Sequence, residues 1–535
     1  MTALKSHLKR NVGAMLLTVS LLTLPGAAWA DGATLKVAVS GSATSLDPTI
    51  SILNNYQLTM QIYEPLVARD ADFNLIPGLA LSWEAVTPTT WRFKLRPGVK
   101  FHDGADFTAE DAAFSITRAK HANSGFKVHA ETLEKIDVID PLTLEITTLE
   151  PDPIVPDRLT QVRILNKNWS VANKSEFPPA AGETEQSFTT VNANGTGPFM
   201  VKDFRPGGTA MLVKNPAWWG KGDAYGNVEN YTYIAISNDA TRLAALLSGE
   251  VDVVIDPPLQ DIQRLRGDSN VRILEGPETR TMHIVLDSER DELPYSDVKG
   301  KNPFKDVRVR QALYQAIDVE TLTSRIMRGG GVVAAAPIAP GVRGYSEAAD
   351  KRQAPYDVEA AKKLLADAGY PDGFGFTYDC TNNRYQNDEA ICQAIVAMWS
   401  RVNMKVTLNA QQHQTFFTKV RKRDSDAFMI GTGAPLMDGY YAIQINMLDK
   451  AAAPGNGLWS LGYTNPAITE IAAKAKNEFD LEKRGKLIEE AMAVYKSDFG
   501  GIPLYHNVGI WAVRGNVKAK YRTDGVLDAR FVTVD

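Results

Sequence analysis

The sequence predicts an α/β protein, because strand and helix patterns alternate through the second half of the chain. Apolar residues at 361–368 recur at the spacing of one helix face, and residues 374–378 then alternate apolar with polar as in a strand. A second helix face at 391–402 is followed by a second alternating run at 404–408. A further helix precedes a short apolar strand at 427–430. Strands that alternate with helices of this length are typical of an α/β domain.

The first thirty residues have the pattern of an export signal. Lys5, Lys9 and Arg10 precede an uncharged, mostly apolar run at 12–24, and Ala28-Trp29-Ala30 supplies a cleavage motif. The apolar run is shorter than the about 20 residues that a membrane-spanning helix needs. We therefore expect a signal peptide at 1–30, cleaved after Ala30. The lack of a cysteine at that point disfavours a lipid anchor and favours the periplasm of a Gram-negative cell.

The remaining chain of about 505 residues is long enough for two or three domains. Without the three basic residues of the export segment, its formal net charge falls from -5 to about -8. Charges of both signs are scattered along it. We therefore expect neither a nucleic acid nor an anionic membrane surface as its partner.

The first half of the chain holds shorter signals. Residues 35–39 alternate as a strand and lead into a polar loop, GSATSLDP, at 41–48. Aromatic and apolar residues at 91–95 alternate with basic ones in a second strand, which ends at a Pro-Gly pair. Residues 175–198 lack periodicity and are rich in Pro, Gly, Ala, Thr and Asn. They predict a surface connection and a lobe boundary.

The stretch VKFHDGADFTAEDAAFSI at 99–116 holds one histidine and four carboxylates, which first suggests a metal or acid–base site. Its His-Asp-Gly triplet, however, has the composition of a turn after a strand. Thr108 and Asp111 have the spacing of a capping box at the start of a helix. Because each polar residue has a structural reason, we predict that this stretch is scaffold.

The chain has two cysteines, Cys380 and Cys392. In an oxidising compartment two cysteines this close are expected to pair, closing a loop worth on the order of 3 kcal/mol. The alternative is a pair of buried thiols on a strand and a helix. Redox chemistry is disfavoured because the spacing is not C-x-x-C.

No pattern in the sequence favours catalysis. There is no H-x-x-x-H pair, no G-x-S-x-G elbow and no phosphate-binding loop, so we predict no enzyme, no metal and no cofactor. Aromatic residues are the better candidates for ligand contact. Tyr440 and Tyr441 follow a glycine-rich segment at 431–435, beyond a strand end where ligands commonly bind in α/β sheets. Trp399, on an apolar helix face, is expected to pack in the core.

Several motifs resemble one family, the family 5 extracellular solute-binding proteins of ABC importers, which includes dipeptide- and oligopeptide-binding proteins. The match runs over nearly the whole mature chain. In sequence order, the motifs are YEPLV (63–67), PGLALSWE (77–84), TWRFKLRPGVKFHDGADFTAEDAAFSI (90–116), GTGPF (195–199), NPAWWG (215–220), FKDVRVRQALYQAID (304–318) and YDVEAAKKLLADAGYPDGF (356–374).

The resemblance implies a two-lobed, clam-like periplasmic-binding-protein fold with an extra subdomain on the first lobe. Such proteins bind a solute between the lobes, close over it and present it to the membrane permease. The expected boundaries place a discontinuous lobe I at 31–75, 197–295 and 506–535, its subdomain at 76–196 and lobe II at 296–505.

The resemblance also points to three ligand-binding segments. They follow the first strand, precede the helix at 391–402 and follow the strand at 427–430. The residues expected to bind the ligand are Ser42, Thr44, Ser45, Arg384, Tyr385, Glu389, Gly431, Thr432, Asp438, Tyr440 and Tyr441.

Two anchors of peptide-binding relatives are replaced in this chain. The place of the aspartate that holds a peptide amine aligns with Pro435, and the nearest acid is Asp438. The place of the arginine that holds a carboxylate is occupied by Glu389, with Arg384 just upstream. A peptide or peptide-like solute is the expected ligand, and an opine, a modified sugar or another non-peptide solute is the alternative. We expect a monomer that serves permease subunits, and a sensing role fits the same sequence.

Overall fold

The computed structural model describes residues 32–50, 53–180, 183, 187–220, 226–452 and 456–535. The predicted signal peptide at 1–30 lies outside these residues. Within the described residues, no helix is long and apolar enough to cross a membrane.

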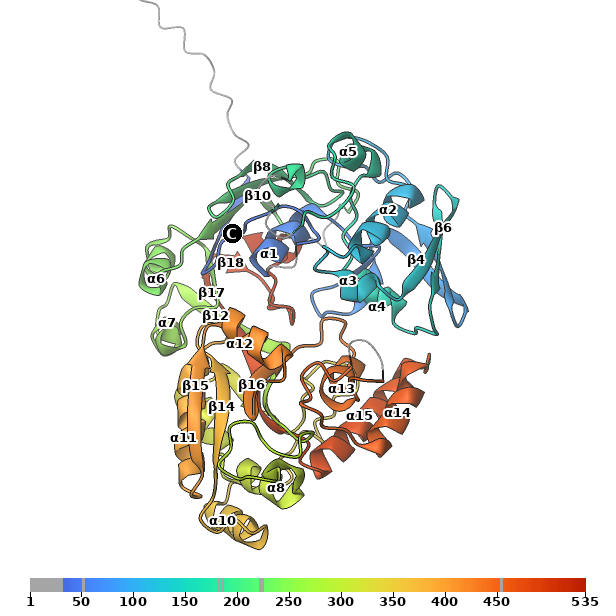
Figure 1. Cartoon of the computed structure of the whole chain (residues 1–535). Helices are drawn as coiled ribbons and strands as arrows, with labels where there is room; N and C mark the ends of the chain where they lie inside the picture. Colours follow the sequence, from blue (N-terminus) through green and yellow to red (C-terminus); the bar gives the residue numbers. More distant parts are fainter. Residues whose placement is uncertain (1–31, 51–52, 181–182, 184–186, 221–225, 453–455) are drawn as a thin grey trace, which may run out of the picture. The chain divides into compact units, whose positions relative to one another are not determined.

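One large mixed sheet runs through most of the described chain (Figure 1). In its first part, β1 (Ala33–Val39) lies between two parallel neighbours, β10 (Val228–Ala235) and β11 (Val253–Ile255). Antiparallel strands β9 (Ala210–Lys214) and β8 (Phe199–Phe204) extend the sheet beyond β10. The predicted strand at 35–39 is therefore a central, buried strand, and its polar loop leaves one end of it.

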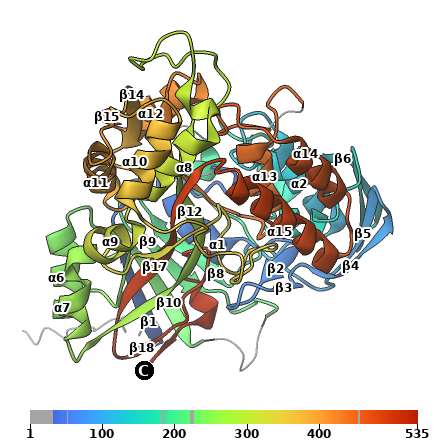
Figure 2. The same cartoon turned by 90° about the horizontal axis from the view of Figure 1, so that it is seen from below.

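Two long strands, β12 (Val271–Leu286) and β17 (Ile502–Arg514), carry the sheet into the second half of the chain (Figure 2). They pair with each other, while the start of β12 and the end of β17 lie near β11. The far part of β12 pairs with β16 (Ala427–Thr432). The short strand β13 (Gly331–Val333) pairs with β17.

The second half has the α/β pattern that the periodicity predicts. Strand β16 is followed across the sheet by β14 (Gly375–Thr381) and β15 (Lys405–Gln411), which run parallel. Figure 1 shows α11 (Asp388–Ser400) beside these two strands. Helix α10 (Val358–Asp367) begins at Asp357, whose side chain accepts from the backbone N–H of Ala360. The predicted α/β class is confirmed.

A separate antiparallel sheet lies in the first half, in the order β4-β5-β7-β6. Its strands and the helix α2 that packs with them share one apolar core around Phe93, Ile116 and Leu144. The bounds are β4 (Ala80–Thr87), β5 (Thr90–Leu95), α2 (Ala109–Lys120), β6 (Leu133–Asp140) and β7 (Thr143–Thr148).

The stretch at 99–116 is scaffold, as predicted. The backbone N–H of Thr108 donates to the Asp111 carboxylate at 2.9 Å, which completes the capping box of α2. His102 lies 3.0 Å through its Nε2 from the backbone oxygen of Gly197. Burial lowers the pKa of the His102 imidazole. Its ring therefore joins the β4–β7 unit to the segment that precedes β8.

The remaining helices and short strands connect and cover these sheets. They are α1 (Leu53–Ile62), β2 (Val67–Arg69), β3 (Leu75–Pro77), α3 (Lys127–Ala130), α4 (Val155–Leu159), α5 (Lys167–Ala172), α6 (Asp239–Ser248), α7 (Ile262–Arg266), α8 (Val307–Gln315), α9 (Val319–Thr321), α12 (His413–Arg421), α13 (Tyr440–Met447), α14 (Pro466–Lys476), α15 (Leu481–Ser497), β18 (Val517–Lys518) and β19 (Thr533–Val534).

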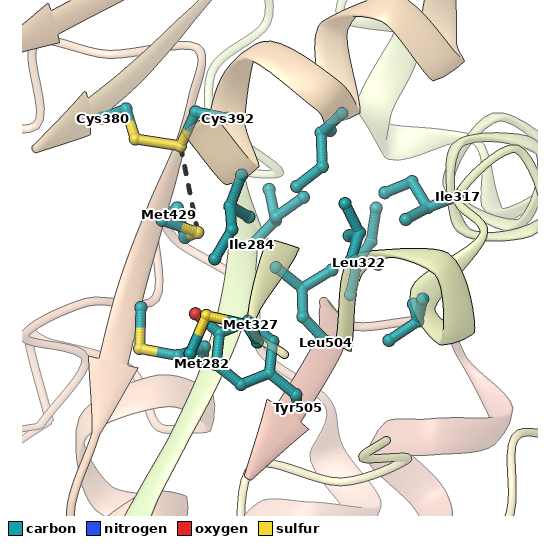
Figure 3. Packing of buried hydrophobic residues seen from close by; sticks show 14 of the residues in the cluster. Met282, Ile284, Ile317, Leu322, Met327, Cys380, Cys392, Met429, Leu504 and Tyr505 are labelled. Atoms are coloured by element: carbon teal, nitrogen blue, oxygen red, sulfur yellow. Dashed lines mark hydrogen bonds between the residues drawn. A yellow bond between two sulfur atoms is a disulfide. The ribbon is translucent and has the colours of Figure 1, made fainter. Parts of the chain in front are cut away.

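The largest apolar core lies around the second part of the sheet (Figure 3). Trp399 is fully buried there and donates its indole N–H to the backbone oxygen of Leu313 at 3.0 Å. This confirms its predicted place in the core. Cys380 on β14 and Cys392 on α11 form the predicted disulfide at the edge of the same core, where Figure 3 shows them beside Met429.

Candidate ligand-binding site

The loop after β1 is held by Asn55 from the first helix. The side-chain oxygen of Asn55 accepts from the backbone N–H groups of Thr44 and Ser45 at 2.8 and 3.3 Å. Ser45 is fully buried, and its hydroxyl accepts from the N–H of Asp47. Thr44 is exposed and Ser42 is half-buried. In this loop, Thr44 and Ser42 are therefore the predicted residues that a solute can reach.

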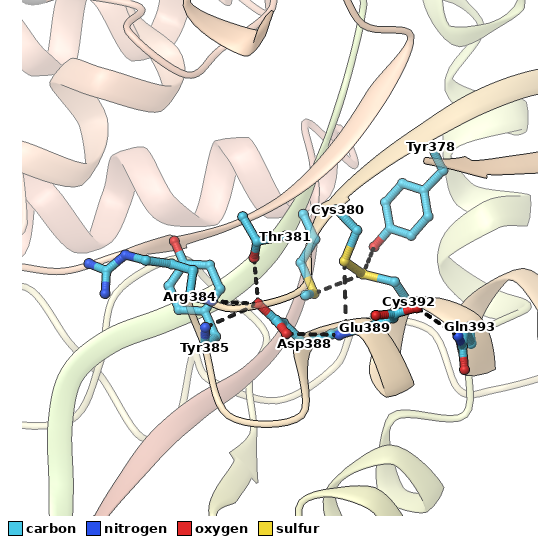
Figure 4. Close-up of a disulfide and its surroundings, with 10 residues drawn as sticks. Tyr378, Cys380, Thr381, Arg384, Tyr385, Asp388, Glu389, Cys392 and Gln393 are labelled. Carbon is cyan, nitrogen blue, oxygen red and sulfur yellow. Dashed lines mark hydrogen bonds between the residues drawn. A yellow bond between two sulfur atoms is a disulfide. The ribbon is translucent and has the colours of Figure 1, made fainter. Parts of the chain in front are cut away.

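The segment with Arg384, Tyr385 and Glu389 is ordered by Asp388 (Figure 4). One carboxylate oxygen of Asp388 accepts from the backbone N–H groups of Arg384 and Tyr385 at 3.0 and 3.1 Å. The same oxygen accepts from the Thr381 hydroxyl at 2.7 Å. The disulfide joins the strand before this loop to the helix after it. The predicted residues are thus presented by a closed, hydrogen-bonded loop.

Tyr385 connects this loop to the end of β16. The backbone N–H of Gly431 donates to the Tyr385 hydroxyl at 3.1 Å. A side chain at Gly431 has no room, because a Cβ there would lie 2.6 Å from the Cδ of Arg280 and 2.8 Å from the sulfur of Met282. Two of the predicted ligand-binding segments are therefore in direct contact.

Two guanidinium groups lie against the ring of Tyr385. The Cζ of Arg384 is 5.3 Å and that of Arg280 is 5.9 Å from the ring centroid. Although Arg384 is exposed, burial of its guanidinium and the nearby charge of Arg280 lower the pKa of this group. The carboxylate of Glu278 lies 3.4 Å from the guanidinium of Arg280. Arg384, in contrast, forms no salt bridge among the described residues. This cluster can bind a carboxylate or another polar anion.

Sequence reasoning missed Arg280 and Glu278. Both lie inside β12, where no motif or periodic break singles them out. The available signal was the polar triplet Glu278-Thr279-Arg280, which follows a Gly-Pro pair and precedes the apolar end of the strand.

Thr432 belongs to the interior. Its hydroxyl lies 2.9 Å from Nε2 of His283 and accepts from the side-chain amide of Asn446 at 3.2 Å. Burial lowers the pKa of His283 to about 4, so the imidazole is neutral at physiological pH. Because Thr432 is buried, its contacts here are structural.

Asp438 forms the centre of a buried ion-pair cluster. Its carboxylate accepts from Arg343 at 2.7 Å and from Arg484 at 2.8 and 3.0 Å. Burial alone raises the pKa of Asp438, but the two guanidiniums outweigh it and hold that pKa below its ordinary value. Both carboxylate oxygens already have charged partners. We therefore leave Asp438 out of the ligand set proposed below.

Tyr440 and Tyr441 open α13 and are half-buried. The guanidinium of Arg484 lies 5.2 Å from the ring centroid of Tyr440, so this ring also packs on the ion-pair cluster. Burial raises the pKa of Tyr440 to about 12 and also raises that of Tyr441, so both hydroxyls stay protonated as potential donors. Glu389 is half-buried and accepts from the side chain of Gln393.

A Thr–His–Asp array joins the long strands β12 and β17 to Asp350 in the loop region that precedes α10. His506 is 2.8 Å through Nδ1 from the Thr281 hydroxyl and 2.7 Å through Nε2 from Asp350. The composition is that of a nucleophile, base and acid, but Thr281 is fully buried and His506 is 1% exposed. The array has no face open to a substrate. Within the described residues, no group of three His, Cys, Asp or Glu side chains is placed to hold a metal ion.

Solved structures with the same fold define the class of protein. The structure of HbpA2 from Haemophilus parasuis has a TM-score of 0.79 at 23% identity, covering 94% of this chain and 100% of that one. The periplasmic binding protein DppA from Helicobacter pylori, in complex with peptide STSA, has a TM-score of 0.76 at 23% identity, covering 94% and 98%. The fold is that of the two-lobed periplasmic binding proteins.

The family follows from the sequence match. The model of the bacterial extracellular solute-binding proteins, family 5, matches residues 74–453. This chain belongs to that family. Among its relatives, the heme-binding protein A of Haemophilus influenzae is 26% identical over 89% of this chain and 87% of that protein. The dipeptide-binding protein of Escherichia coli is 25% identical over 96% of this chain and 97% of that protein.

Proposed function

We propose that this protein is the substrate-binding component of an ABC importer in the periplasm, and that it captures a peptide or peptide-like solute for the membrane permease. The observation that carries the proposal is its family membership together with full-length similarity to relatives named as dipeptide- and oligopeptide-binding proteins. It acts by binding and release, without catalysis. We expect one copy of the chain to serve each transporter.

The solute is captured between two lobes that close over it. Lobe I comprises 31–75, 197–295 and 506–535, with a subdomain at 76–196, and lobe II comprises 296–505. The separate sheet β4–β7 inside 76–196 and the long strands β12 and β17 support this division. A solute shifts the open–closed equilibrium by its greater affinity for the closed form.

We propose that Arg384 and Tyr385 make the principal polar contacts of lobe II with the solute, and that Arg280 also contacts it. A guanidinium beside an aromatic ring binds carboxylates in a bidentate manner and packs on apolar side chains. The further residues of the proposed set are Ser42, Thr44, Glu389, Gly431, Tyr440 and Tyr441.

Thermal-shift measurements test the ligand class. The purified protein is heated with di- to pentapeptides, oligosaccharides and opines in parallel. A solute at 100 times its Kd stabilises the folded protein by about 2.7 kcal/mol, which raises the Tm measurably. A response to opines or sugars with none to peptides would overturn the peptide assignment. Mass spectrometry of the same samples should recover every solute unchanged, and a new product would refute the non-catalytic role.

A matched pair of arginine variants tests the proposed contacts. Loss of one charge-assisted hydrogen bond to a carboxylate costs about 1.5–3 kcal/mol, or about 10- to 100-fold in Kd. Arg384→Met should weaken the binding of a solute that stabilises the wild-type protein by this factor, and should leave the Tm without solute unchanged. Arg205→Met is the control, since the side chain of Arg205 is 80% exposed and lies outside the proposed set. Equal affinities of the two variants would remove Arg384 from the site.

A further inference from the structure

A small cavity between the first part of the chain and its C-terminal segment is lined by four arginines. Its walls come from α1, the β2–β3 hairpin, the segment at 160–163 and the C-terminal segment at 522–530. The four cations in these walls are Arg69, Arg163, Arg522 and Arg530.

The cavity borders the loop that follows β16. The side chain of Gln161 donates to the backbone oxygen of Pro435 at 3.3 Å, and that of Arg69 donates to the backbone oxygen of Leu436 at 3.2 Å. Both donors line the cavity. The loop that follows β16 therefore forms part of the border of this cavity.

Three of the four arginines have acidic partners. Arg69 pairs with Asp157 at 2.8 Å. Arg522 pairs with Asp524 and Asp528 at 2.9 and 3.1 Å, and Arg530 pairs with Asp528 at 2.5 Å. Their charges are balanced within the protein. The partners are Asp157, Asp524 and Asp528.

Arg163 is different. It is 6% exposed, and within the described residues no carboxylate forms a salt bridge with it. One terminal nitrogen contacts the Tyr56 hydroxyl at 3.0 Å and the Met60 sulfur at 2.7 Å, and its Nε has no hydrogen-bond partner. A thioether is a weak acceptor and a phenol carries no charge. A buried cation is stabilised by an anion, and its unpartnered N–H by a hydrogen-bond acceptor.

Glu64 lines the same cavity but its carboxylate is already engaged. It accepts from the indole N–H groups of Trp218 and Trp219 at 3.0 and 2.9 Å and from the Thr196 hydroxyl at 2.9 Å. Burial raises the pKa of Glu64, which disfavours its charged form. The hydrogen bonds of Glu64 are thus to these neutral donors and not to Arg163.

We propose that Arg163 binds a carboxylate in this cavity, with the Tyr56 hydroxyl and the Gln161 amide at its edge. The bound carboxylate belongs to the captured solute. This assignment rests on the proposed function and restricts the ligands of the protein to solutes with a carboxylate. A free carboxylate from solvent offers the same chemistry. The two sources are separated by the experiment.

The first measurement uses sodium acetate as the probe, with sodium chloride at equal ionic strength as the reference. Acetate should raise the Tm of the wild-type protein and of the control Arg205→Met, and should leave Arg163→Met unchanged. Circular dichroism checks that the variant is folded. If Arg163→Met fails to fold, Tyr56→Phe and Arg163→Lys replace it, and each should reduce the acetate response. An acetate response that survives these substitutions would overturn the site.

The second measurement uses peptides that stabilise the protein, each compared as free acid and C-terminal amide. The wild-type protein should bind the acid at least tenfold more tightly, and Arg163→Met should show a smaller preference than Arg384→Met. If acetate binds but the acid is not preferred over the amide, Arg163 binds a free carboxylate from solvent and not the carboxylate of the solute. Absence of both effects would refute the proposal. Failure of every peptide to bind would refute the peptide ligand alone, because the acetate measurement reads Arg163 independently.

Discussion

The backbone N–H of Gly431 donates to the phenol oxygen of Tyr385 at 3.1 Å. This bond joins the loop before α11 to the end of β16, two segments that lie 46 residues apart in the sequence. Because Gly431 has no side chain, the strand end approaches Arg280 and Met282 closely. The Tyr385 hydroxyl therefore links the two predicted ligand segments directly.

Tyr385→Phe should remove this hydrogen bond and leave the ring in place. We expect the free energy of unfolding to fall by about 1 kcal/mol and the affinity for a stabilising solute to fall with it. Urea unfolding and titration of the solute measure the two effects. Tyr356→Phe is the matched control, since that ring is 40% exposed and surface changes are worth about 0.5 kcal/mol or less. Unchanged affinity in Tyr385→Phe would show that the two loops are positioned independently.

The double variant Cys380→Ala/Cys392→Ala should lose stability because the disulfide restricts the unfolded chain. The two cysteines are 12 residues apart, for which chain entropy in the unfolded state is worth about 3 kcal/mol. Dithiothreitol should destabilise the wild-type protein and leave the double variant unaffected. Hydrogen exchange should quicken at 384–388, the loop that the disulfide closes. Protection unchanged in that loop would show that Asp388 alone orders it.

Asp438→Asn should be strongly destabilising. The substitution leaves Arg343 and Arg484 without their counter-charge, and breaking a buried ion pair costs about 3–5 kcal/mol. Thermal and urea unfolding without any solute measure the effect. Asp203→Asn is the control, because that carboxylate is 48% exposed and 3.7 Å from its partner. A solute-free Tm equal to that of the wild-type protein, combined with weaker solute binding, would restore Asp438 to the ligand site.

Local patterns were predictable from the sequence and distant pairings were not. The alternating runs around 374–408, the capping box at Thr108 and the cysteine pair all depend on neighbours in the chain, and each is present. The partners of Asp438 lie 95 and 46 residues away, so its ion pairs left no local signal. The same holds for Arg280, which approaches Gly431 only because β12 and β16 pair across the sheet.

The proposed carboxylate site at Arg163 could not be predicted from the sequence either. Its sequence neighbours at 160–165 form no motif, and its cavity is closed by α1 and the C-terminal segment, which are distant in sequence. Motif and loop position do not distinguish Arg163 from the other polar residues of the chain. The structure adds the balance of buried charges, which singles out one arginine among four.

Buried His283 should make the stability depend on pH in a defined window. Burial lowers its pKa from the ordinary 6.5 to about 4 in the folded protein, so between these values the unfolded chain binds more protons. Stability from this group is complete above pH 6.5 and is lost as the pH falls toward 4, by at most about 3 kcal/mol.

His283→Gln should abolish this part of the pH dependence. Urea unfolding of both proteins at pH 7.5, 6, 5 and 4.5, chosen to span about two units below the ordinary pKa, should show their stability difference shrinking on acidification. Thr432→Ala is the control, because it removes the partner hydroxyl of His283 and keeps the imidazole. It should retain the wild-type slope. If the His283→Gln and wild-type proteins lose stability in parallel over this range, His283 does not titrate on unfolding, and the decline belongs to the buried carboxylates instead.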